Sequence, residues 1–316
     1  EEKPIGANEE LAGRFGRAFA ERLQLDPGYL LPAFEDTWYY LWRERRLPVN
    51  VDPADSRLDD EMERARLARI FEQGLESAIG HVLPIQRVYG NGARWRSGPW
   101  FVRPEKMYLV PGDSPIGFRL PLDSLPWAAP GDRAQFYESD PTMPREPLPP
   151  LDAMRRAATV TMQSVLDRSR DEHAVGNGHG NGQSRRNPTA LDAVPGRGAS
   201  ASWLVRTAIS FEPRDGHLFV FMPPAETAED YLDLVAAVED TAEELDTPVF
   251  VEGYAPPFDP RLNHFSVTPD PGVIEVNIHP SLGWRELVDK TEIIYEEARA
   301  TRLGAQKFML DGRHTG

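Results

Sequence analysis

The chain has 316 residues, with 50 acidic and 35 basic side chains and a net charge of -15 at pH 7. This charge argues against a protein that grips nucleic acid electrostatically. Cysteine is absent, which excludes disulfides, thiolate zinc sites and thioester chemistry. No apolar run is long enough to cross a bilayer and no secretion signal opens the chain, so we expect a soluble, cytoplasmic protein without a membrane partner. The chain opens without methionine and ends within what reads as a loop, and we therefore expect a piece of a longer polypeptide.

Residues 1–138 predict helices followed by short strands. Asn8 is placed to cap a helix whose apolar residues recur every fourth position. A second, short helix is expected to anchor on the core through Trp38, Leu41 and Trp42. The other elements expected here are a charged amphipathic helix over 57–80 and paired strands at 100–102 and 106–110.

Residues 139–200 differ in composition from the segments on either side. Proline dominates 141–150, while glycine and asparagine dominate 175–184. Such a composition cannot bury enough apolar surface to offset the entropy lost on ordering. We therefore predict a flexible linker or insertion.

Residues 201–316 carry the most regular pattern. The predicted order is a strand at 202–212, a turn at 213–216, a strand at 217–222, a helix at 226–246, a strand at 248–252, a hairpin over 262–278 and a helix from 283. This order predicts an α+β fold in which an antiparallel sheet has helices packed on one face.

The last strand of that sheet alternates polar and β-branched residues. Glu275, Asn277 and His279 therefore project to one side. A carboxylate, an amide and an imidazole at this spacing can hold a divalent cation or orient a polar ligand. Alternation alone, however, is the ordinary signature of a half-buried strand, and it favours a polar face turned to water.

Two further glutamates, Glu212 and Glu252, stand at strand ends. A sheet does not gather carboxylates cheaply unless cations or arginines lie among them, because like charges repel. The arginines available are Arg206, Arg214 and Arg313. The alternative is that both glutamates are solvated strand termini, and the residues alone do not decide between the two.

Several long motifs resemble the bacterial amidoligase family. They are VRTA at 205–208, FEPRDGHLFVFMPP at 211–224, VEGY at 251–254, GVIEVNIHP at 272–280, KFMLDGRHTG at 307–316, YYLWRERRLPVNVD at 39–52 and GDSP at 112–115. The resemblance covers nearly the whole chain outside the linker. It implies a glutamine synthetase-like fold, shared with glutamate–cysteine ligases, and often fusion to or association with a transglutaminase-like domain. It also implies ATP-dependent joining of a small-molecule or peptide carboxylate to an amine.

The resemblance assigns roles to individual residues. Glu275 and Asn277 are similar to the Glu-x-Gln strand of the synthetases, in which the glutamate binds Mg²⁺ and the amide lies beside the substrate. Glu212 and Glu252 resemble the other metal-binding glutamates. Arg206 and Arg214 are expected to contact nucleotide phosphates. The expected catalytic residues are His279, Arg313 and His314.

Some roles stay open at this point. His279 suits a metal ligand, a base or a structural hydrogen bond. Arg313 and His314 begin a glycine-rich loop that in the family carries a further Asn-His pair, and the chain ends before that pair. Two other functions remain alternatives to the ligase: a non-catalytic interaction module of a larger protein, and a metal-dependent hydrolase.

Overall fold

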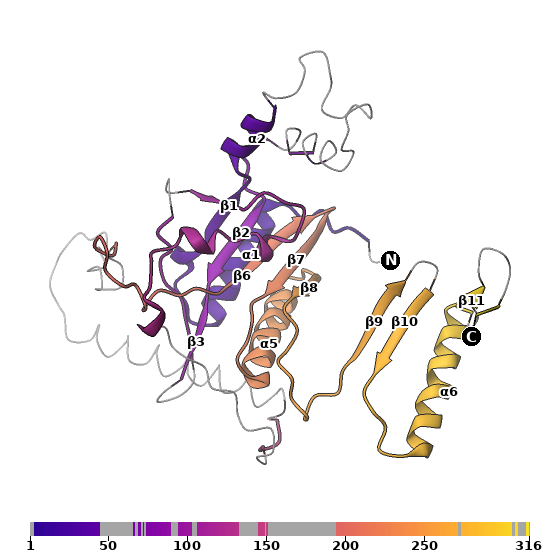
Figure 1. Cartoon of the computed structure of the whole chain (residues 1–316). Helices are drawn as coiled ribbons and strands as arrows, with labels where there is room; N and C mark the ends of the chain where they lie inside the picture. The colour runs from indigo at the N-terminus through magenta and orange to yellow at the C-terminus, as the bar shows by residue number, and fades with distance from the viewer. Residues whose placement is uncertain are drawn as a thin grey trace. The chain divides into compact units, whose positions relative to one another are not determined.

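The computed structural model describes residues 3–44, 66, 69–70, 72, 74–89, 94–102, 106–132, 145–148, 150, 194–270, 273–304, 307–308 and 314–315 (Figure 1). These residues divide into two compact units, Glu1–Pro257 and Phe258–Gly316. Most of 139–200 lies outside the described residues, so the linker there stays a prediction. Within the described part of the chain, no helix is both long enough and apolar enough to cross a membrane.

The first unit is built on a six-stranded sheet in the order β5-β1-β2-β6-β7-β8. Its strands are β1 (Leu31–Phe34), β2 (Gly80–Pro84), β5 (Met107–Tyr108), β6 (Ala208–Arg214), β7 (His217–Met222) and β8 (Val249–Gly253). The α-helices are α1 (Glu9–Arg22), α2 (Thr37–Glu44) and α5 (Ala228–Glu244). Among the described residues, the unit also contains a small hairpin, β3 (Gln86–Val88) with β4 (Arg94–Arg96), and the 3-10 helices η1 (Pro27–Tyr29), η2 (Ile116–Phe118), η3 (Leu122–Ser124) and η4 (Pro130–Asp132).

The α+β class is confirmed, but the expectation of an antiparallel sheet is wrong. β6 and β7 form the predicted hairpin, whose turn is closed by Asp215 and Gly216 at positive φ. β7 and β8 instead run parallel, because α5 carries the chain back between them. β1 and β5 are also parallel, so the sheet is mixed.

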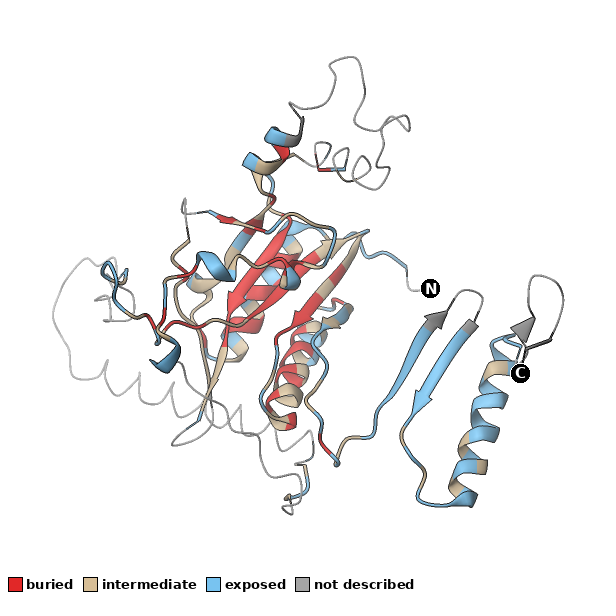
Figure 2. Ribbon diagram, viewed as in Figure 1, coloured by how far each residue is buried: buried red, intermediate tan, exposed pale blue. Residues whose placement is uncertain are grey.

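Helices cover one face of the sheet, as the sequence predicted. α1 packs on β2, β6 and α5. Its Asn8 cap accepts a hydrogen bond from the backbone of Leu11, as expected. The rings of Phe15 and Phe19 lie 5.6 and 5.5 Å from the ring of Phe211 in β6. Figure 2 shows the buried residues concentrated on the central strands and on the helix sides that face them.

The opposite face is partly covered by the loop that contains η2. Ile116 of this loop is fully buried in a second core with Ala33, Val82 and Met107. The loop approaches so closely that a Cβ on Gly117 would lie 2.0 Å from the ring of Phe221. Glycine is therefore required where the loop meets the sheet.

The second unit contains the predicted second hairpin. β9 (Phe265–Asp270) and β10 (Val273–Ile278) pair antiparallel, with Glu275 opposite Thr268. The remaining elements are α6 (Trp284–Ala300), β11 (Lys307–Phe308) and β12 (His314–Thr315). No residue of α6 is buried.

Two local predictions in the first half are wrong. Trp38 of α2 is 74% exposed and Trp42 is 44% exposed, while the intervening Tyr40 is fully buried. The predicted pairing of 100–102 with 106–110 is also absent from the described structure, since β5 pairs with β1 instead. Most of the helix expected over 57–80 lies outside the described residues, and Gly80 already begins β2.

Replacing Gly117 by alanine tests the close approach of the loop. We expect Gly117→Ala to destabilise the protein by about 1–3 kcal/mol, because the added methyl group overlaps the ring of Phe221. The matched control is Gly131→Ala in η4, where a Cβ meets no atom within 4 Å. The measurement is the urea midpoint of unfolding; equal midpoints for both variants would contradict the close contact.

His81 predicts a pH dependence of stability. Burial between β2 and α1 lowers the pKa of His81 below 6.5, against the opposing effect of Glu9, 3.4 Å away, and with a smaller lowering effect of Arg17. The unfolded chain then binds the proton more tightly, so stability falls as the pH drops below 6.5. We expect His81→Gln to reduce this loss between about pH 7 and pH 5, and the same change at exposed His264 to leave it unaltered. Urea midpoints across this range test the prediction, and a wild-type slope in His81→Gln would refute it.

Candidate functional site

Two glutamates and an arginine converge on the sheet face opposite α1 and α5. Glu212 and Arg214 lie two residues apart on β6 and so share a face, and Glu252 joins them from β8. One Arg214 nitrogen, Nη2, donates to Glu252 Oε2 at 2.5 Å. Another, Nε, lies 3.9 Å from Glu212 Oε1. These three side chains are called the acidic cluster below.

Glu212 is the most buried member of the acidic cluster, at 8% exposure. The backbone N–H of Ile116 donates to its Oε2 at 3.0 Å. Burial raises the pKa of Glu212, while the Ile116 hydrogen bond and Arg214 act in the opposite direction and Glu252 adds to the rise. The charged carboxylate is therefore incompletely compensated.

Glu252 contributes an oxygen without a partner. Its Oε1 is buried, and no described residue hydrogen-bonds to it. Arg214 cannot fill this position easily, because its guanidinium lies 3.8 Å above the ring of Phe219 while reaching Glu252 Oε2. Glu212 Oε1 and Glu252 Oε1 are thus the two carboxylate oxygens that are least satisfied in the acidic cluster.

Carboxylate oxygens of this kind are the donors that Mg²⁺ prefers. The pair therefore fits a hard cation in its chemistry and in its unmet hydrogen-bonding capacity. Within the described ranges, however, no group of three or more histidine, aspartate or glutamate side chains has the geometry of a metal site. The first unit supplies two carboxylate ligands, and water or ligand oxygens would have to supply the others.

Aromatic rings surround the acidic cluster on the same face. Phe219 stacks on Phe250 with centroids 5.2 Å apart. Phe118, Phe221 and Tyr254 form a second group, in which the Phe118 and Phe221 rings are 4.7 Å apart. Phe118 is 58% exposed and Tyr254 is 47% exposed. We call these five rings the aromatic platform.

Sequence reasoning missed the aromatic platform. Its only local signal is the alternation of His217, Phe219 and Phe221 along β7, which places these rings on one face. Tyr254 is positioned by Gly253, whose φ of 102° is open only to glycine in practice and whose Cβ would lie 2.6 Å from a backbone oxygen of Met222.

The predicted β10 residues lie in the second unit. Asn277 Nδ2 donates to Glu275 Oε1 at 3.0 Å, so these two side chains share a face as expected. His279 follows the strand, and its Nε2 lies 2.9 Å from Nζ of Lys290. Because a lysine ammonium can only donate, Nε2 is the acceptor in this contact. Lys290 also pairs with Glu286 at 2.5 Å.

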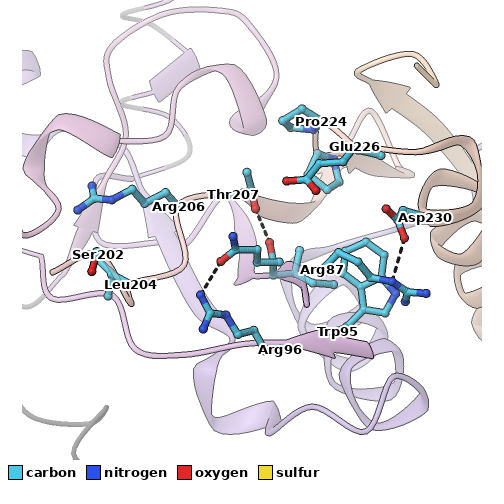
Figure 3. Close-up of a pocket in the computed structure, with 14 residues that line it drawn as sticks. Arg87, Trp95, Arg96, Ser202, Leu204, Arg206, Thr207, Pro224, Glu226 and Asp230 are labelled. Atoms are coloured by element: carbon cyan, nitrogen blue, oxygen red, sulfur yellow. Dashed lines mark hydrogen bonds and ion pairs between the residues drawn. The ribbon is translucent and has the colours of Figure 1, made fainter. Parts of the chain in front are cut away.

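The structure separates Arg206 from the acidic cluster. Arg206 precedes β6 and donates to the carbonyl of Pro126, whereas Glu212 lies six residues further on, roughly 20 Å along an extended chain. Arg206 instead lines a cleft beside the start of β6 (Figure 3). Arg313 lies outside the described residues, and His314 is described only as part of β12.

The described structure is thus an α+β protein whose sheet carries paired carboxylates, an arginine and exposed aromatic rings on one face. The sequence profile of one family matches residues 1–316 in full, and its description is "Putative amidoligase enzyme (DUF2126)". The chain therefore belongs to this amidoligase family, as the motifs indicated. No curated protein and no solved structure matches it significantly.

Removing Arg214 tests the electrostatics of the acidic cluster. We expect Arg214→Met to destabilise the protein by about 1–3 kcal/mol near neutral pH, because two poorly solvated carboxylates lose their shared counter-charge. The double variant Arg214→Met/Glu252→Gln should lose less than the sum of the single changes. Urea unfolding with EDTA present measures all four proteins, with exposed Arg14→Met as control. Strict additivity would show that Arg214 and Glu252 are not coupled.

Proposed function

We propose that this protein is an ATP-dependent carboxylate–amine ligase that forms an amide or peptide bond through an acyl phosphate. Its membership of the amidoligase family supports ligase chemistry. The observation that carries the proposal is the acidic cluster, in which buried Glu212 stands beside a Glu252 oxygen that has no partner among the described residues. A glutamine synthetase-like fold, a transglutaminase-like partner domain and work in the cytoplasm belong to the same proposal.

Glu252 would hold Mg²⁺ through Oε1, which has no partner among the described residues, and Glu212 through Oε1, which only Arg214 approaches, at 3.9 Å. The resemblance adds Glu275 as a third metal ligand. Bound there, Mg²⁺ would neutralise charge on the phosphate oxygens of ATP during phosphoryl transfer. Glu212 suits this role physically, because a cation would offset the desolvation that raises its pKa.

Arg214 is the phosphate contact that the structure supports best. It lies between the two glutamates, and its Nε has no hydrogen-bond acceptor within the described structure. A guanidinium in this position can donate to a phosphate oxygen while it stays stacked on Phe219. Arg206 lies at the other end of β6, so its proposed phosphate role rests on the resemblance alone.

The aromatic platform offers a surface for the base of a nucleotide. Phe118 and Tyr254 are exposed, and Phe221 lies between them in direct register with Glu252 on the neighbouring strand. Stacking on such rings contributes about 1–3 kcal/mol per base in proteins that bind single-stranded nucleic acid, and an adenine ring offers the same π-face. The platform thus supports ATP as the co-substrate.

The roles proposed for His279 and Asn277 depend on the hydrogen bonds that these side chains already make. Lys290 donates to His279 Nε2, so this nitrogen can take a proton from an attacking amine only after the contact opens. Asn277 Nδ2 donates to Glu275 Oε1, so the carbonyl oxygen of the same amide is not used in this contact and stays available for the proposed role. Arg313 and His314 keep their proposed catalytic roles on the resemblance.

Calorimetric titration of the whole chain with Mg-ATP tests the proposal. We expect saturable heat with the wild type and binding weakened about tenfold or more by Glu252→Gln or Glu275→Gln, because each removes a charged metal ligand. Glu76→Gln, the same change at an exposed turn, should bind as the wild type does. Binding that ignores both substitutions, or requires no Mg²⁺, would favour an interaction module. A reaction that releases product without consuming ATP would favour the hydrolase.

A further inference from the structure

A cleft lies beside the start of β6 and the end of β7, and no residue of the acidic cluster lines it. It has a volume of about 240 Å³ and is formed by four segments: β2 to β3, β4, the stretch before β6, and the turn from β7 into α5. Figure 3 shows the arginines Arg87, Arg96 and Arg206 together with Glu226 and Asp230 around it. None of these side chains has a role in the proposed ligase site except Arg206, which is discussed above.

The positive charge of Arg87 is already neutralised by carboxylates of the protein. Its Nε lies 2.8 Å from Asp230, and its Nη1 lies 2.7 Å from Asp233. The guanidinium also rests 5.0 Å from the centre of the Trp95 ring, and the Trp95 indole donates to Asp233. Two carboxylates and one ring hold Arg87 in the wall of the cleft, so it has little capacity left for a ligand.

Arg96 is different, because it has no carboxylate partner in the described structure. Its Nη2 donates to the neutral amide oxygen of Gln86 at 2.8 Å, and its Nε is buried without an acceptor. Burial lowers the pKa of Arg96, yet a guanidinium keeps its charge in proteins. A partly buried cation with an unpaired, buried N–H is costly unless an anion compensates its charge.

The charges around the cleft favour a ligand with a single negative charge. Glu226 and Asp230 line the cleft beside the arginines, and Glu226 is exposed. Both would repel a phosphate dianion more strongly than a carboxylate, which carries one negative charge. Carboxylates also match the planar fork of a guanidinium.

We propose that this cleft binds a small organic carboxylate, with Arg96 as its anchor, at a site separate from the acidic cluster. The carboxylate accepts hydrogen bonds from the guanidinium of Arg96, which has no carboxylate partner in the described structure. This site does not depend on the ligase proposal, because no residue of the acidic cluster lines the cleft.

The test uses N-acetylglycine, a small monocarboxylate with a peptide group, and the indole N–H resonance of Trp95, assigned with Trp95→Phe. We expect a saturable shift of this resonance in the whole chain, and no such shift with inorganic phosphate at the same concentration. Arg96→Gln should weaken binding about tenfold or more, while exposed Arg14→Gln should not change it.

A second variant is needed because Arg96→Gln could lose binding simply by failing to fold. Gln86→Glu places a carboxylate on Arg96 within the protein, so it should raise the urea midpoint and suppress binding of N-acetylglycine. Unchanged affinity in both variants, or no saturable shift with the wild type, would overturn the proposal. Phosphate binding as tightly as N-acetylglycine would overturn the assignment to a carboxylate.

Discussion

The antiparallel pairing of β2 with β6 holds the first unit together. It joins His81 to Phe211 and Pro84 to Ala208, across more than a hundred residues of chain. One face of this pair carries α1 through the contacts of Phe211, and the other carries the loop of Ile116 above Glu212. Closing such a long loop costs entropy that only extensive burial can offset. The two cores on opposite faces of β2 and β6 supply that burial.

The same pair of strands separates two kinds of charged site. On the face that carries Glu212, Glu252 Oε1 is buried without a partner among the described residues, and in the cleft Arg96 Nε is a buried donor without an acceptor among them. Both arrangements cost stability, since a buried charge prefers a partner. Proteins retain such costs where a ligand makes the missing interaction. The acidic cluster and the cleft therefore each contain a buried polar atom whose missing hydrogen-bond partner a ligand can supply.

Much of the fold could be predicted from the sequence, because its signals are local. The cap at Asn8, the turn before β7 and the helix over α5 each depend on a few neighbouring residues. What failed depends on distant partners. The helical spacing of Trp38 and Trp42 does not determine which side of α2 packs on the core. In the structure Tyr40 is buried, and the two tryptophans are exposed. Likewise β5 pairs with β1, some seventy residues earlier, rather than with its sequence neighbours.

The candidate site shows the same division. The convergence of Glu212 and Glu252 follows from strand alternation together with the family's motifs, but the role of Arg214 as their common partner requires the register of β6, β7 and β8. Arg206 shows what the sequence could not predict. It stands only a few residues before Glu212 in the chain, and yet it lies at the opposite end of β6 from this glutamate. The cleft could not be foreseen, since four separate segments build it.

Gly253 joins the end of β8 to the loop that begins with Tyr254. Its positive φ turns the chain directly after Glu252, and the backbone of the next residue, Tyr254, then bonds to Met222. The position of Glu252 is thus fixed by β8, while the position of the Tyr254 ring is fixed by the turn at Gly253. Substitutions in the loop beyond Tyr254 can accordingly move this ring without moving the carboxylate of Glu252, so that the aromatic and acidic parts of the surface can vary independently during evolution.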